Sequence, residues 1–119
     1  ATAQIVRQRI DESVKLINIA PNAAVLLSWA TFESAARLAL MKQGRLLERT
    51  TSGSLVSALA LDGLISPQEE ADLQKIAARR NRIAHGEFSA SVSTSECLQL
   101  LRLAEQLISD NQESPITQS

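Results

Sequence analysis

A chain of 119 residues with 45% hydrophobic content has enough apolar material for one small core but not for two. The formal net charge is −1, so any strongly electropositive surface must be local. Only Trp29, Phe32 and Phe88 are aromatic, which argues against a β-sandwich or barrel core and against a stacking platform for single-stranded nucleic acid. The composition favours one small all-α domain with an aliphatic core packed between helices.

The residue types present in the chain exclude several other kinds of functional site. One histidine and one cysteine give no zinc spacing, the acidic residues lack the pattern of a calcium loop, and no glycine-rich loop follows a strand. We therefore expect no metal and no cofactor. Cys97 has no partner for an internal disulfide, which fits a reducing compartment. No apolar run approaches membrane-spanning length and no basic-then-apolar leader is present, so we expect a soluble, cytoplasmic protein.

The first half of the chain predicts three helices. The first runs roughly from Thr2 to Ala20, and its apolar stripe consists of Val6, Ile10, Val14 and Ile17. Pro21 marks a break. The second helix, to about Gln43, is apolar nearly all round and is expected to be the centre of the bundle or a subunit contact. A loop over 44–53 precedes a short, buried helix over 55–61.

Two capping boxes define the second half. Ser66-Pro67-Gln68-Glu69 opens a helix that Gly86 closes, and its apolar face carries Leu73, Ile76, Ala77 and Ala84. Ser93-Thr94-Ser95-Glu96 opens a final helix after the serine-rich linker 88–92. Its inward side chains are Leu100, Leu101, Ala104, Leu107 and Ile108. We expect one domain over 1–109 and a disordered tail over 110–119. Because the chain opens at Ala1 instead of Met, it is compatible with a fragment of a larger protein.

The segment Arg80-Asn81-Arg82-Ile83-Ala84-His85-Gly86 places the lone histidine near a helix end. Lys75, Arg79, Arg80 and Arg82 precede His85 with no acidic residue among them, which predicts a local positive cluster suited to a phosphate. We assign RNA contacts to Lys75, Arg79 and Arg82.

Positions within this helix separate the candidate side chains. The apolar stripe passes through position 80, so Arg80 is predicted to point toward the bundle interior or a partner. Asn81 and His85, four residues apart, share a different face of the helix. His85 is rotated about 140° from Arg80 around the helix axis. By itself, His85 favours the simpler interpretation of a solvated histidine that the helix dipole stabilises.

Glu33 and Arg37 are two charges in the apolar second helix. They interrupt the stripe formed by Leu26, Ala30 and Leu40, with the carboxylate four residues before the guanidinium. Two interpretations remain open. The pair extends its charged ends to the edge of the core, or Glu33, Arg37 and Arg80 form one polar network.

Two motifs together resemble a known family. The Arg80 to His85 segment is similar to the arginine, polar residue, three further residues, histidine signature of HEPN domains (higher eukaryotes and prokaryotes nucleotide-binding). The segment from Trp29 to Arg37 resembles their acidic early helix. The likeness covers roughly residues 3–109. It implies a four- or five-helix bundle that dimerises through the signature helices and, in many members, cleaves RNA without a metal.

The resemblance also implies site roles. Arg80 would stabilise charge on the scissile phosphate, Asn81 would position it, His85 would act as general acid or base, and Glu33, supported by Arg37, would orient Arg80. Many toxin members carry a tyrosine two residues after the histidine, where this chain has Glu87.

The expected partners follow from the same likeness. We expect a homodimer that acts on RNA or binds a nucleotide-like ligand and has no membrane association, with an antitoxin or a fused domain as a further partner in a toxin–antitoxin or defence system. The alternative is a non-catalytic dimerisation or interaction domain of a larger protein.

Overall fold

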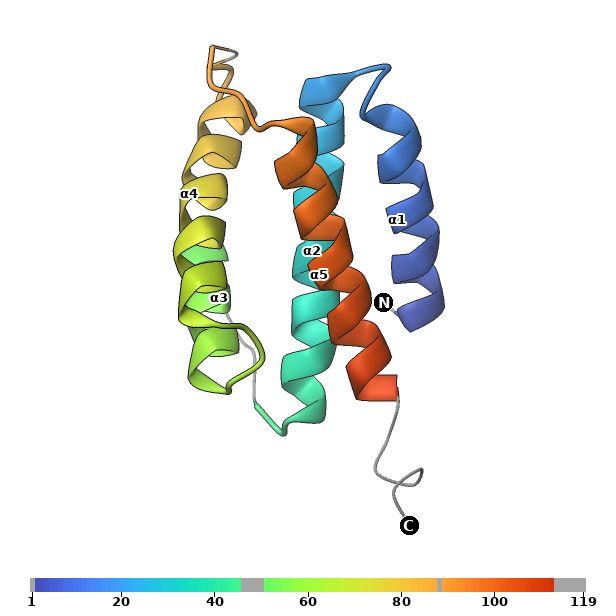
Figure 1. Ribbon diagram of the computed structural model, residues 1–119, viewed down its shortest axis with the longest axis vertical. Helices are drawn as coiled ribbons and strands as arrows, with labels where there is room; N and C mark the ends of the chain where they lie inside the picture. Colours follow the sequence, from blue (N-terminus) through green and yellow to red (C-terminus); the bar gives the residue numbers. More distant parts are fainter. Residues whose placement is uncertain (1, 46–50, 88, 113–119) are drawn as a thin grey trace.

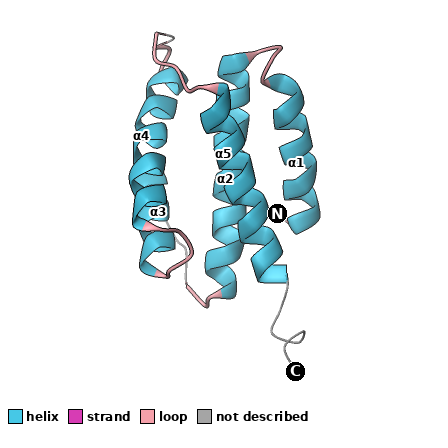
Figure 2. Cartoon of the chain, in the orientation of Figure 1, coloured by secondary structure: helices cyan, strands magenta, loops and turns pink. Residues whose placement is uncertain are grey.

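The computed structural model describes residues 2–45, 51–87 and 89–112, which form an all-helical bundle (Figures 1 and 2). Its helices are α1 (Ala3–Leu16), α2 (Pro21–Lys42), α3 (Ser52–Leu61), α4 (Pro67–Ala84) and α5 (Thr94–Gln112). The described part contains no strand. The predicted helical bundle is confirmed.

The centre of the bundle is α2, which every other helix contacts. In Figure 1, α5 lies in front of α2, α1 lies on one side, and α3 and α4 lie on the other side. Contrary to the expectation that no apolar run approaches membrane-spanning length, α2 is long and apolar enough to cross a membrane among the described helices, and 56% of that stretch is buried inside the bundle. Its apolar character is therefore that of a core helix, as the sequence predicts.

Local side-chain chemistry sets the helix starts. Ser66 Oγ accepts from the Glu69 backbone N–H (3.1 Å), and Glu69 Oε1 accepts from the Ser66 N–H (2.8 Å), so the predicted capping box forms. Ser93 and Glu96 make the same reciprocal pair before α5 (3.1 and 2.9 Å). After α4, Gly86 has φ of +89°, a left-handed conformation that suits glycine and ends the helix.

The first helix differs from its prediction. It ends at Leu16 because residues 17–19 form a turn. Val14, assigned to the inward stripe, is 46% exposed, whereas Ser13 is buried. Serine is tolerated at this buried position because its hydroxyl donates a hydrogen bond to the Arg9 carbonyl (2.8 Å).

Two other helix boundaries differ from their predictions. The third helix begins at Ser52, not at residue 55, because Thr51 and Ser54 form a further capping box. The last helix continues to Gln112, so residues 110–112, predicted to begin a disordered tail, are helical. The rest of the predicted tail (113–119), residues 46–50 of the predicted loop and Phe88 of the linker lie outside the described residues. The predicted inward residues of the final helix are all buried.

Candidate functional site

The candidate site lies at the C-terminal end of α4. This helix is anchored by Leu73, Ile76, Ala77 and Ile83, which are buried mainly against α2 and α3. Ala84, predicted on the same face, is exposed. His85 is the C-cap residue, its backbone N–H donates to the Asn81 carbonyl (3.1 Å), and its side chain is exposed. The exposed imidazole therefore stands where an external ligand can reach it.

Arg80, predicted to point toward the bundle interior or a partner, lies at the edge of the bundle. The side chain is only partly exposed, and its Nε is enclosed without a hydrogen-bond partner. Its Nη1 donates to Asn81 Oδ1 (2.9 Å), so the amide holds one branch of the guanidinium. A buried donor that lacks an acceptor costs roughly 1–3 kcal/mol, more when the group is charged. Within the described residues no acceptor contacts Nη2, so this branch of the guanidinium, not the enclosed Nε, is the part that an external anion can bind.

The predicted positive cluster is partly neutralised. Arg79 forms a two-pronged pair with Glu96 of α5, in which its Nη1 donates to Oε1 (2.9 Å) and its Nη2 to Oε2. Arg82 Nε donates to Glu87 Oε2 (2.6 Å). Among the described residues no carboxylate pairs with Lys75 or Arg80. The local excess of charge therefore comes from these two cations, not from all four.

Because Glu96 pairs with Arg79, its contribution to the stability of the fold depends on pH. Hydrogen bonds from the Arg79 guanidinium lower the pKa of this carboxyl, against the opposing effect of burial. A lowered pKa in the folded state means that Glu96 contributes stability above the usual glutamate pKa and loses it as pH falls through the lowered value.

We expect Glu96→Gln to flatten the acid limb of the stability profile. The amide still caps α5 but cannot bind a guanidinium as a carboxylate does. Urea denaturation from about pH 7 to about pH 3 should show a smaller fall in unfolding free energy than in the parent. Asp11→Asn neutralises a carboxylate at an exposed position without an ion pair among the described residues, and serves as the control. Parallel profiles for the parent and Glu96→Gln would contradict the assignment.

Glu33 does not form the predicted polar network. Its Oε2 accepts from Ser52 Oγ (2.8 Å), and the same hydroxyl oxygen accepts from Trp29 Nε1 (3.2 Å). No hydrogen bond or ion pair joins Glu33 to Arg37 or Arg80 within the described chain. The physical reason is proximity, because the N-terminus of α3 supplies a hydroxyl to the half-buried carboxylate. Glu33 fastens α3 to α2 and does not contact Arg80.

Arg80 and Asn81 are joined by a hydrogen bond, and His85 follows one turn later with an exposed side chain. Within the described residues no hydrogen bond or ion pair joins them to Glu33 or Arg37. A guanidinium and an imidazole near one helix end can bind a phosphate and exchange a proton with it. Within the part of the chain that the structure describes, no cluster of three or more histidine, cysteine or acidic side chains could hold a metal ion.

Sequence reasoning missed three residues that shape this region. Glu96, Glu87 and Ser52 take the partners Arg79, Arg82 and Glu33. Only Glu87 carried a local signal, since it lies five residues after Arg82 beyond the helix end.

In comparisons with protein-family models, with curated proteins and with solved structures, no match to this chain was found.

Proposed function

We propose that this chain is a HEPN-like domain that acts on RNA as a metal-independent endonuclease, or binds RNA or a nucleotide-like ligand, as a cytoplasmic homodimer. The observation that carries the proposal is the partly exposed Arg80, whose guanidinium has no carboxylate partner within the described residues and whose Nη1 donates to Asn81 Oδ1, one turn before the exposed His85. A phosphate oxygen is an acceptor that suits a guanidinium.

Each residue has a distinct task in this proposal. Cleavage by the RNA 2′-hydroxyl needs a base for its proton, an acid for the leaving 5′-oxygen and positive charge for the phosphorane. His85 serves as acid or base, Arg80 stabilises the charge, and Asn81 positions Arg80. One histidine per chain cannot readily do both proton transfers at once, so a second copy would complete the chemistry. Lys75 extends the phosphate contact, whereas Arg79 and Arg82 contribute less because they pair with carboxylates.

A non-catalytic interaction domain is the second candidate. It is favoured by the pairing of Arg79 and Arg82 within the chain, which uses charge that an RNA track would need, and by the separation of Glu33 from Arg80. Such a domain would serve a larger protein or an antitoxin-like partner.

We expect His85→Ala to abolish cleavage of mixed RNA substrates in the presence of a chelator, while the far-ultraviolet circular dichroism stays unchanged. Removal of the exposed imidazole removes the proton-transfer group and no packing. The parent should leave 2′,3′-cyclic phosphate ends, detected by mass spectrometry of the products. Arg80→Lys keeps a positive charge but loses the planar guanidinium, so it should retain only a small part of the activity.

The control is Lys15→Ala, an equally exposed change on α1 away from the site. It should cleave as the parent does. Absence of cleavage by the parent, or equal cleavage by His85→Ala, would leave the interaction domain as the better account.

A further inference from the structure

The chain turns back on the last turn of α4 directly after His85. The Gly86 N–H donates to the Ile83 carbonyl (3.0 Å), and Gly86 has φ of +89°. The Glu87 N–H donates to the Arg82 carbonyl (2.9 Å). These two bonds and the left-handed glycine form the Schellman motif, a backbone arrangement that ends many helices. The turn brings the Glu87 carboxylate to Arg82, whose Nε donates to Oε2 (2.6 Å). A carboxylate two residues after His85 is therefore held against a cation of the same helix end.

The two arginine–carboxylate pairs of α4 differ in how firmly they are built. Arg79 binds Glu96 through two contacts, and these side chains are 31% and 27% exposed. Arg79 Nη1 also donates to the Ser91 carbonyl (3.3 Å). Arg82 and Glu87 share one contact, and their side chains are 55% and 54% exposed. Exposed ion pairs of this kind add little to stability. The Arg82–Glu87 pair can therefore open without loss of the fold, whereas the Arg79–Glu96 pair joins α4 to α5.

Arg82 and His85 lie on one face of the helix end. Residues three apart on a helix are neighbours, and both of these side chains are exposed. Lys75, which lies two turns before Arg82 on the same face, is exposed as well. A phosphate bound by Arg82 is thus placed beside the imidazole, with a second cation further along the same face.

We propose that Glu87 is an internal competitor of RNA at this helix end: it holds Arg82 in the free protein, and an RNA phosphate displaces it. Carboxylate and phosphate oxygens bind the same guanidinium donors, so one of the two occupies Arg82 Nε at a time. This role rests on the proposed action on RNA and adds a residue that sets the affinity of the same site. Glu87 favours a ligand with a chain of phosphates, which contacts Lys75 as well, over a single small anion.

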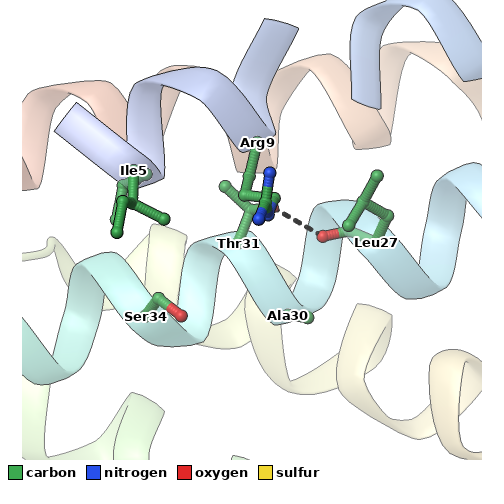
Figure 3. A pocket seen from close by; sticks show the side chains of 7 residues that line it. Ile5, Arg9, Leu27, Ala30, Thr31 and Ser34 are labelled. Atoms are coloured by element: carbon green, nitrogen blue, oxygen red, sulfur yellow. Dashed lines mark hydrogen bonds between the residues drawn. The ribbon is translucent and has the colours of Figure 1, made fainter. Parts of the chain in front are cut away.

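A second exposed ion pair supplies a matched control. Arg9 Nη1 donates to both carboxylate oxygens of Glu12 (3.2 and 3.0 Å), and the two side chains are 47% and 54% exposed. Arg9 lines a hollow of about 150 Å³ between α1 and α2, together with Ile5 and Leu27 (Figure 3). Among the described residues that line this hollow there is no histidine and no second cation. Glu12→Gln therefore makes the same charge change and releases an arginine, but away from His85.

The test is the affinity for a fluorescent RNA oligonucleotide with 2′-O-methyl groups, measured by anisotropy in chelator over a salt series. Such an oligonucleotide keeps every phosphate but cannot be cleaved by attack of its own 2′-oxygen. We expect Glu87→Gln to bind on the order of threefold to fivefold more tightly than the parent at about 0.1 M salt, the effect of releasing one exposed ion pair. The gain should shrink as salt rises, because salt screens the attraction between Arg82 and Glu87. Glu12→Gln should bind as the parent does.

A double-variant cycle with Arg82 identifies the partner through which Glu87 acts. In the Arg82→Gln background, Glu87→Gln should leave the RNA affinity unchanged, because no guanidinium remains to be released. Equal tightening with and without Arg82, or equal tightening by Glu12→Gln, would show a general effect of net charge and overturn the proposal. If the parent binds RNA and Glu87→Gln binds no more tightly, the role of Glu87 fails alone. If neither protein binds RNA, the proposed function fails with it.

Discussion

Replacing Trp29 with alanine is expected to lower the free energy of unfolding by about 3–5 kcal/mol, the usual cost of deleting a buried aromatic side chain. Trp29 is fully buried on α2 and packs with Phe32, with 5.2 Å between ring centroids. Its indole N–H donates to Ser52 Oγ, which donates to Glu33. The substitution therefore removes core volume and weakens the attachment of α3. Urea denaturation followed by circular dichroism measures the loss.

Two companion variants separate packing from hydrogen bonding. Trp29→Phe keeps an aromatic ring but loses the donor, and Ser52→Ala removes the hydroxyl between Trp29 and Glu33. Each should cost less than Trp29→Ala, roughly 1–3 kcal/mol for the polar group left without its partner. Ile19→Ala, at a residue that is 78% exposed, is the control. A Trp29→Ala loss no larger than that of the control would show that the bundle does not depend on this residue.

Helix starts were predictable where the capping chemistry is local. The Ser66 and Ser93 boxes each carry a glutamate three residues on, and both form. The box at Thr51 has Ser54 in the glutamate position, inside a stretch that contains Gly53, so its composition indicated a loop. The buried side chains of α3 hold this segment in a helix despite its low propensity.

Hydrophobic periodicity alone could not predict which face of α1 is buried. The helix packs against both α2 and α5, and this geometry buries Ser13 and exposes Val14. A serine that bonds to the preceding turn is inexpensive to bury, so the apolar pattern did not distinguish the two positions.

The site was predictable only in part. Features set by positions along one helix could be predicted from the sequence, whereas contacts between different helices could not. The placement of Arg80 at the edge of the bundle and the exposure of Asn81 and His85 follow from positions on one helix. The partner of Glu33 depends on which residue of another helix lies nearest. The pattern indicated that this carboxylate needs a partner but could not distinguish Arg80 from Ser52.

Replacing Leu73 with alanine is expected to cost about 2–5 kcal/mol, because a fully buried leucine loses its contacts and leaves a cavity. Leu73 lies on the face of α4 that packs against α2 and α3, seven residues before Arg80 on the same stripe. Loosening this anchor should also raise amide hydrogen exchange across residues 79–86. Leu61→Ala makes the same change at a residue that is 78% exposed and should stay within about 0.5 kcal/mol of the parent. Equal losses in the two variants would mean that α4 does not depend on this contact. A larger loss at Leu73 without faster exchange over residues 79–86 would mean that the site end of α4 is anchored by Ile83 and the Arg79–Glu96 pair instead.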